Sequence, residues 1–495
     1  MARKIFTRKI IWILGAALLL TASPAWAQVN FKPLERGDFE EKNEIPFSVR
    51  GLEVGLEYAL LVENLEYPGL PAGGEGTFNR QDIRLELKTV FHQDVSLHLM
   101  MGPTRNDMEN GSLRAYSEGE PGQRLTDSQP TQLGLRESYL RYRFNPNSAM
   151  LLGKHELSVA DKRGKIFNAV VPAYTFDCQV GTWCMPFGVG FIGSQSGDAI
   201  YHWGLQYNAW NYGEKPLKNK MEVEVYRVIY LEHGVPLATN LGPGSFDPEN
   251  PDIPLEGQLT DSGVPVYYDT RKDDYYGVRM EILAGWFFWD LDLLGHKGSR
   301  VYHSPSAEGQ RYKVRAKAVE SHLGVRWEGG RVGMHFLFAS GDPYKDPASQ
   351  ESYLRHLEGY HEITPGSYKG TRLYFNGGDS QVDDGAGLGH SINNTGMLGL
   401  TFQVDDRATR QVSFKGGLYR LRYNHAVPGK NGNLIRDIGV EWDNQLTWHV
   451  HKALRFQFEA NALKPGPAFR LNDYSPPSDV SEYYIQALAR LVYSF

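Results

Sequence analysis

The stretch YYIQALARLVYSF, residues 483–495, decides the fold class. Apolar side chains recur at every second position from Tyr483 to Phe495, with mostly polar or small residues between them. Neighbouring side chains of a β-strand point to opposite faces, so this pattern gives one apolar face and one mixed face. An apolar alternation that ends on an aromatic residue is typical of the closing strand of a bacterial outer-membrane β-barrel, and is similar to the signal read by the barrel assembly machinery. An amphipathic edge strand of a soluble β-protein is the alternative for this segment alone.

The first 27 residues have the features of a secretory signal peptide. Four basic residues open this leader, namely Arg3, Lys4, Arg8 and Lys9. An apolar stretch follows over residues 10–20, and Ala25-Trp26-Ala27 has the small-residue pattern of a cleavage site. The apolar stretch is shorter than the roughly 20 residues that span a bilayer as a helix, which disfavours a signal anchor. We expect the mature chain to begin at Gln28 with a polar, acidic periplasmic tail over residues 28–44.

Residues 45–495 are expected to form a single transmembrane antiparallel β-barrel, an all-β domain of about 16–18 strands. The mean hydropathy of −0.44 fits a chain whose apolar residues alternate with polar ones. Tight turns are expected at residues 92–94 and 145–147. Three segments rich in Gly, Pro, Ser and Asp, at 102–131, 231–271 and 341–391, are predicted to be extracellular loops, a loop folded into the lumen, or periplasmic gates. The hairpin parity between residues 167 and 230 stays open, because it depends on whether residues 173–177 form a strand.

Charge and motifs exclude several classes of protein. Four of the 52 Lys and Arg residues lie in the leader, which has no acidic residue, so the 58 Asp and Glu residues leave the mature chain at a formal charge of −10. Such a chain is not expected to bind nucleic acid. No G-x-S-x-G, P-loop, H-E-x-x-H, zinc or haem-attachment motif is present, so we predict neither an enzyme nor a metal or cofactor site. Cys178 and Cys184 lie close together in an exported chain, which favours a local disulfide.

Strands with one charged face indicate which residues line the lumen, because Arg or Lys facing lipid at the midplane of a barrel wall costs about 2–4 kcal/mol. In the clearest early strand, residues 83–91, Arg84, Glu86 and Lys88 share the face opposite Ile83 and Leu85. The same reasoning assigns further charged residues to the lumen, including acids, so we expect it to carry both signs. These further residues are Arg279, Arg311, Lys313, Arg315, Lys317, Glu441, Asp443 and Arg455.

Two short groups of residues resemble the bacterial alginate export family. One is Asp437-Ile438-Gly439-x-Glu441-x-Asp443 with Lys464-Pro465-Gly466, and the other is Arg136-Glu137 followed by Gly153-Lys154. The resemblance implies an 18-stranded monomeric barrel with an arginine-rich constriction and loops that gate the pore. It also implies that Arg136, Glu137 and Lys154 line the substrate path. In a regular strand only one of the consecutive residues Arg136 and Glu137 can face the lumen.

Three functions are compatible with these features. The first is an outer-membrane channel for passive export or diffusion of an anionic polysaccharide or a related anionic solute, served by periplasmic secretion partners. The second is a general or small-solute porin, and the third is a barrel that sheaths an electron-transfer cytochrome. In each case the chain is expected in the bacterial outer membrane, in contact with lipid and lipopolysaccharide.

Overall fold

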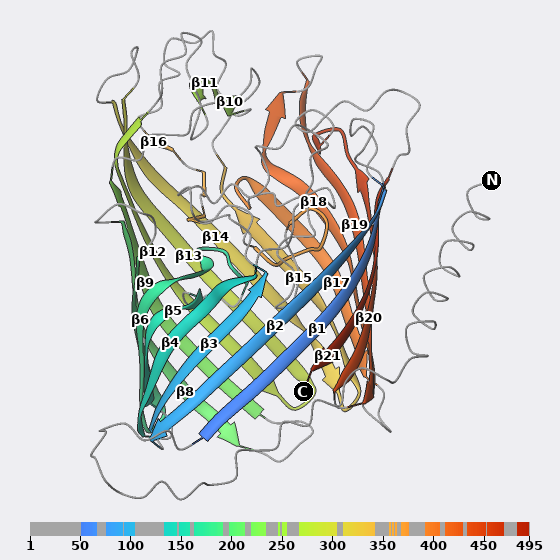
Figure 1. Cartoon of the computed structure of the whole chain (residues 1–495). Helices are drawn as coiled ribbons and strands as arrows, with labels where there is room; N and C mark the ends of the chain where they lie inside the picture. Colours follow the sequence, from blue (N-terminus) through green and yellow to red (C-terminus); the bar gives the residue numbers. More distant parts are fainter. Residues whose placement is uncertain are drawn as a thin grey trace, which may run out of the picture.

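A computed structural model of the chain shows tilted strands wrapped into a barrel (Figure 1). The structure describes residues 51–66, 76–92, 94–103, 133–145, 148–158, 163–191, 198–212, 219–233, 246–247, 250–254, 267–303, 310–341, 356–357, 359–360, 362–363, 368–375, 392–405, 411–428, 433–451, 453–469 and 483–494. The predicted signal peptide and periplasmic tail lie outside these ranges. Among the described residues, no helix is long and apolar enough to cross a membrane.

Eighteen strands of the described chain form one closed antiparallel sheet, within the range that the sequence predicts. They are β1 (Gly51–Glu66), β2 (Gly76–His92), β3 (Val95–Pro103), β4 (Leu133–Asn145), β5 (Ser148–Ser158), β6 (Asn168–Val180), β7 (Trp183–Phe191), β8 (Ala199–Tyr212), β9 (Asn219–His233), β12 (Tyr267–Ala284), β13 (Phe287–His303), β14 (Gln310–Trp327), β15 (Gly330–Ala339), β17 (Thr395–Asp405), β18 (Val412–Pro428), β19 (Leu434–His451), β20 (Leu454–Pro465) and β21 (Tyr484–Ser494). Each strand pairs with its neighbours in the chain, and β1 closes the ring by pairing with β21.

Three shorter strands are not among these eighteen, although one of them, β16, adds to the same sheet. β10 (Phe246–Asp247) and β11 (Asn250–Pro254) form a small hairpin of their own. β16 (His356–Leu357) pairs in parallel with the upper part of β14, where His356 lies opposite Lys313. All three belong to the end of the barrel that carries the long connections (Figure 1).

The closing strand has the two faces that its sequence predicts. On β21 the inner set Gln486, Leu488 and Arg490 is buried, at 1–2% exposure, while Tyr493 on the alternate face is 38% exposed. Tyr493 lies opposite Tyr58 of β1, so the outer face continues across the closure. The alternation at residues 483–495 therefore predicts the strand and the direction of its faces.

The two ends of the barrel differ in the length of their connections. The turns that join β2 to β3, β4 to β5, β6 to β7, β12 to β13 and β14 to β15 are tight and lie at one end, where positive φ at Gly181 (61°) and Gly285 (55°) permits sharp reversal. The three long segments predicted from composition all join strands at the other end. Outer-membrane barrels have short periplasmic turns and long extracellular loops, so the long end is the extracellular one. β6 includes residues 173–177, which settles the open hairpin parity.

The predicted disulfide between Cys178 and Cys184 is wrong. Cys178 lies opposite Met185 in the β6–β7 ladder, and Cys184 lies opposite Gln179. Residues directly opposite each other share a face, so Cys178 shares the outer face with Met185, which is 50% exposed, whereas Cys184 lies on the inner face. Both thiols are free, because the register directs them to opposite sides of the wall.

Exposed aromatic side chains gather on the outer face close to the tight turns. Trp183, Trp286, Trp327 and Trp448 are each 39–66% exposed, and each lies within a few residues of such a turn. Amphipathic rings at this position suit the boundary between lipid tails and headgroups. They mark the periplasmic edge of the apolar band on the barrel wall.

Candidate functional site

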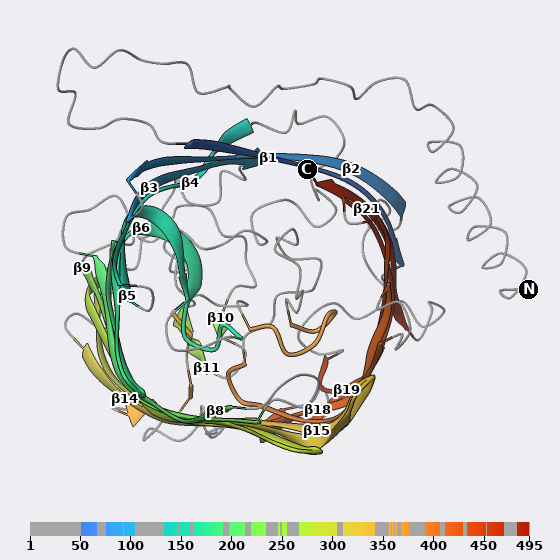
Figure 2. The same cartoon turned by 90° about the horizontal axis from the view of Figure 1, so that it is seen from below.

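Two connections from the extracellular end fold into the barrel and meet there (Figure 2). Residues 163–167 belong to the connection between β5 and β6, and residues 360, 362–363 and 368–375 to the connection between β15 and β17. We call these residues the inner partition. The Ile363 amide donates to the Ile166 carbonyl at 2.9 Å, and the Lys369 amide donates to the Arg163 carbonyl at 2.8 Å. The two connections therefore form one hydrogen-bonded unit, in agreement with the lumen-folded loop considered for residues 341–391.

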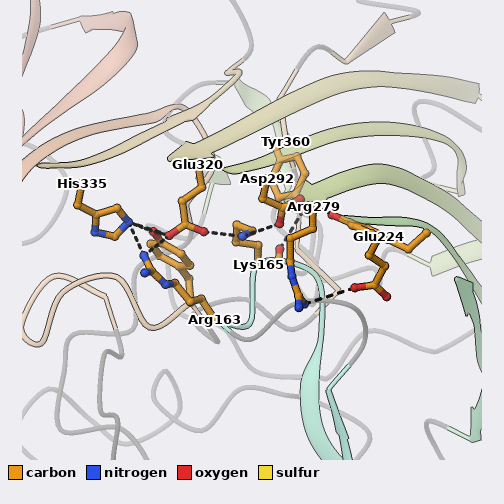
Figure 3. Close-up of polar contacts among 10 residues, drawn as sticks. Arg163, Lys165, Glu224, Arg279, Asp292, Glu320, His335 and Tyr360 are labelled. Carbon is orange, nitrogen blue, oxygen red and sulfur yellow. Dashed lines mark hydrogen bonds and ion pairs between the residues drawn. The ribbon is translucent and has the colours of Figure 1, made fainter. Parts of the chain in front are cut away.

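A buried charge network fixes the partition to the wall formed by β13 and β14 (Figure 3). The Lys165 amino group lies 2.5 Å from Glu320 and 2.7 Å from Asp292, and all three side chains are 5–6% exposed. Arg163 donates to the other Glu320 oxygen at 2.6 Å, as Tyr368 does at 2.8 Å. Burial alone would lower the pKa of Arg163, but the negative charge of Glu320 outweighs it and raises that pKa above its usual value. Arg163 therefore stays charged and paired with Glu320.

Histidines extend this network along the inner face. His335 lies 2.7 Å from the same Glu320 oxygen that Arg163 contacts, and its ring is buried. His322, on the same inner face of β14, lies 2.8 Å from the Thr401 hydroxyl of β17. The wall that the partition contacts is thus polar over several adjacent strands.

Carboxylates of β19 and β20 hold the other side of the partition. Glu441 accepts hydrogen bonds from the Thr371 hydroxyl at 2.7 Å and from the backbone amides of Leu373 and Tyr374 at 2.5 and 3.0 Å. Next to it, the Arg372 amide donates to Asp443 at 3.1 Å, and the Arg372 guanidinium pairs with Glu459. Because two separate stretches of wall hold it, the partition crosses the lumen between them.

A second group of charges continues the network toward β9. Arg279 of β12 lies 2.5 Å from Glu222 and 3.4 Å from Glu224, both on β9. The Tyr226 hydroxyl, on the same strand, donates to Asp292 at 2.7 Å and so links this group to the partition. The negative charges of these acids on β9 are therefore balanced by a neighbouring cation.

The wall beyond these contacts, formed by the periplasmic part of β20 with Arg455, by β21 and by β1 to β4, carries more cations than acids among its described inner residues. Lys88 pairs with Glu53 at 2.6 Å, and Glu86 lies on the same inner face. Cations on this wall come from four strands and include Arg84, Lys88, Arg141, Arg143, Arg455 and Arg490. The charge balance of the lumen therefore differs between the side that holds the partition and the side that faces it.

The structure places most of the predicted lumen residues on the inner face. These are Arg84, Lys88, Glu137, Arg279, Glu441, Asp443 and Arg455, each in register with inner residues of adjacent strands. Arg136 is the extra residue of a β-bulge, because Glu137 lies opposite Met100 while Leu135 lies opposite Met101. A bulge places two residues of β4 against one residue of β3, so the rule that only one of two consecutive residues can face the lumen does not apply to this irregular stretch.

The prediction for Lys154 and the prediction for three cations of β14 are wrong, because these side chains lie on the outer face of the barrel and not in the lumen. Lys154 lies opposite Ser138 and next to the outward Leu152, which is 50% exposed, and its amino group donates to the Leu135 carbonyl at 3.2 Å. On β14 the inner face carries Ala318 and Glu320, whereas Lys313, Arg315 and Lys317 alternate with it and are exposed on the outer face. The side chain of Arg311 lies outside the described residues.

Sequence reasoning missed the two cations at the centre of the network. Arg163 and Lys165 lie in a connection with no strand periodicity, so no pattern marked them. Glu320 could have been found by continuing the β14 alternation down to Leu323, Val325 and Trp327, an apolar set that shares a face with the three exposed cations. Among the described residues, no group of three or more His, Cys, Asp and Glu side chains could hold a metal ion.

Comparisons with known proteins place the fold among outer-membrane porins. No protein-family model matches the chain, and no curated protein does. A BenF-like porin from Pseudomonas fluorescens Pf-5 aligns over 90% of this chain and 98% of its own, with a TM-score of 0.50 and 9% identity. Two Pseudomonas aeruginosa structures, OccK2 (OpdF) in complex with glucuronate and OpdK with vanillate, each cover 91% of this chain and 99% of their own, with TM-scores of 0.49 and 0.48 and identities of 11% and 9%.

Identities this low show the fold alone. The chain is an all-β barrel with the fold of outer-membrane porins, as the sequence predicts. The resemblance to the alginate export family, which depends on short motifs, finds no support in these comparisons.

Proposed function

We propose that the chain is a constricted diffusion channel for small anionic solutes. The inner partition carries this proposal, because it joins two inward connections and is held to β13, β14, β19 and β20 by buried contacts. Porins and related barrels achieve selectivity by narrowing the lumen and lining the narrow part with fixed charges. A solute must pass between the partition and the wall that faces it.

The charges on that facing wall support a preference for anions. The cations of the partition are occupied, since Lys165 contacts two carboxylates and Arg372 contacts Glu459. Arg84 and Arg455 lie on the facing wall, where described cations outnumber acids. Arginine binds carboxylates through two parallel hydrogen bonds, so a small carboxylate is the anion best suited to such a wall. Glu53, Glu86 and Glu137 interrupt the cations and limit how tightly an anion is held.

The partition weighs against the two other functions considered from the sequence. A polysaccharide would have to displace a segment whose side chains include Tyr360, Tyr368 and Phe375 at 0% exposure. A sheathed cytochrome needs a lumen that is open across its whole width, which a partition anchored at both sides does not leave. A small-solute porin requires no such displacement.

Planar-bilayer recording of the refolded mature protein tests the proposal. In a potassium chloride gradient the reversal potential should show anion selectivity, and millimolar glucuronate should interrupt the current. Liposome swelling should show uptake of glucuronate and exclusion of long uronate oligomers. Cation selectivity, or equal uptake of the monomer and long oligomers, would overturn it.

A further inference from the structure

The cations that the sequence assigns to the lumen on β14 form part of a cluster on the outside of the barrel. Lys313, Arg315 and Lys317 share the outer face with Leu323 and Trp327, which are 42% and 39% exposed. The opposite face of the same strand holds Glu320, whose carboxylate binds the inner partition. These three cations therefore face the membrane and take no part in the solute path.

The neighbouring strands add cations at the same level. In the register of β9, β12, β13 and β14, one row reads Leu231, Lys272, Ser299, Lys313; the next reads Ile229, Asp274, Lys297, Arg315; and the third reads Arg227, Tyr276, Gly295, Lys317. We call the six cations Arg227, Lys272, Lys297, Lys313, Arg315 and Lys317 the outer basic grid. With strands about 4.8 Å apart and same-face residues about 6.7 Å apart along a strand, the grid measures roughly 14 Å on each side.

The grid begins where the apolar band ends. Lys317 lies ten residues from Trp327 along β14. At about 3.3 Å per residue and a strand tilt of roughly 35–45°, this separation corresponds to a height of about 23–27 Å. The apolar band of outer-membrane barrels is about 25 Å tall. Trp327 marks its periplasmic edge, so the cations lie at its extracellular edge, at the level of the outer-leaflet headgroups.

The charges of the grid are largely uncompensated by protein. The acid within it, Asp274, is engaged by Arg227 through two hydrogen bonds of 2.8 and 2.7 Å. The other five cations form no ion pair within the described part of the chain. Lys297 lies over the Tyr276 ring at 5.1 Å. Lys297 also lies directly opposite Arg315, and like charges in that position repel each other. An anion between the two strands would remove this repulsion.

We propose that the outer basic grid binds the phosphorylated headgroup of an outer-leaflet glycolipid, lipopolysaccharide. Phosphate oxygens accept charge-assisted hydrogen bonds from Lys and Arg, and the spread of the grid over three rows suits a headgroup that carries more than one phosphate. The apolar surface directly below, with Val278 and Leu293 at 41% and 44% exposure, can hold the acyl chains of the same molecule. A soluble anion would contact only the cations of the grid. A phosphorylated lipid can contact both the cations and the apolar surface below them, so the lipid is the occupant that we propose.

Native mass spectrometry of the full mature chain in detergent, titrated with rough lipopolysaccharide, tests this proposal. The double variant Lys297→Gln with Arg315→Gln should bind at least tenfold more weakly than the wild type. The matched control is Arg420→Gln with Lys464→Gln, which removes two other outward cations at the same end of the barrel and should retain binding. The charge-retaining variant Lys297→Arg with Arg315→Lys should also retain most of it.

Two further readouts keep the test independent of folding and of channel function. All variants should show the same heat-dependent shift in electrophoretic migration as the wild type, and the same anion selectivity in bilayers. Enzymatically dephosphorylated lipid should bind to the wild type no more tightly than to the Lys297→Gln, Arg315→Gln variant. Equal weakening in the control pair, or undiminished binding of the dephosphorylated lipid, would overturn the proposal.

Discussion

The amino group of Lys165 lies 2.5 Å from the carboxylate of Glu320, and the two side chains are only 5% and 6% exposed. Lys165 belongs to a short connection that enters the barrel, whereas Glu320 is part of the wall. A pair that is buried to this extent fixes position, because separating the charges would leave each of them desolvated and unpaired. The contact therefore determines how the inner partition sits in the lumen.

Neutralising Glu320 should loosen the partition. Glu320→Gln removes the countercharge of both Arg163 and Lys165, and breaking a buried pair from one side costs about 3–5 kcal/mol. We expect a higher single-channel conductance with frequent transitions between levels, measured in planar bilayers. Glu86→Gln, which neutralises an acid of the facing wall that does not contact the partition, serves as the control and should keep a steady single conductance level. Unchanged, steady conductance in Glu320→Gln would show that the partition does not narrow the path.

A change at the opposite attachment should widen the size limit for solutes. Glu441→Gln keeps the volume of the side chain but replaces a carboxylate that accepts three hydrogen bonds from residues 371–374. Hydrogen bonds to a charged group contribute about 1.5–3 kcal/mol each. We expect the wild type to exclude neutral trisaccharides and the variant to admit them, as measured by liposome swelling. Glu53→Gln, whose carboxylate contacts Lys88 and not the partition, should leave the size limit unchanged.

Ion selectivity should follow the face on which a cation lies. Arg84→Gln and Arg455→Gln remove inner charges, so each should shift the reversal potential toward zero in a salt gradient. Lys313→Gln removes a charge of the same sign from the outer face and should leave the reversal potential at the wild-type value. If Lys313→Gln shifted the potential as far as Arg455→Gln, the inner and outer assignment of β14 would be wrong.

The sequence predicts the barrel and most of its lumen-facing strands because alternation is a local property. On β2, β12 and β20 one face of the strand is charged and the other is apolar. At this height the outer face contacts lipid tails, so the charged face must be the one that faces the lumen. On β14 the same rule fails, because Lys313, Arg315 and Lys317 lie above the apolar band. An outward cation at that height contacts lipid headgroups, so its free-energy cost is small. The prediction for Lys154 depends on a short motif, and a motif does not determine the register of a strand.

The partition could not be predicted residue by residue. Its hydrogen bonds join Arg163 to Lys369 and Ile166 to Ile363, positions about 200 residues apart in chain segments without periodicity. Such contacts depend on where the closed sheet carries each connection. Composition identified 341–391 as a functional loop, but the shorter connection that holds Lys165 had no comparable signal.

The opposite faces of the two cysteines give a direct test of the wall around the β6–β7 turn. Cys184 lies on the inner face and Cys178 shares the outer face with Met185. In proteoliposomes, a charged water-soluble thiol reagent should therefore modify the variant that retains only Cys184 (Cys178→Ser), because water in the lumen carries the reagent to it. The variant that retains only Cys178 (Cys184→Ser) should resist that reagent and react with a lipid-soluble maleimide, because its thiol borders the acyl chains. The wild type should show two free thiols in a titration without reductant. A disulfide in the wild type, or equal labelling of both variants by the charged reagent, would contradict the register of this hairpin.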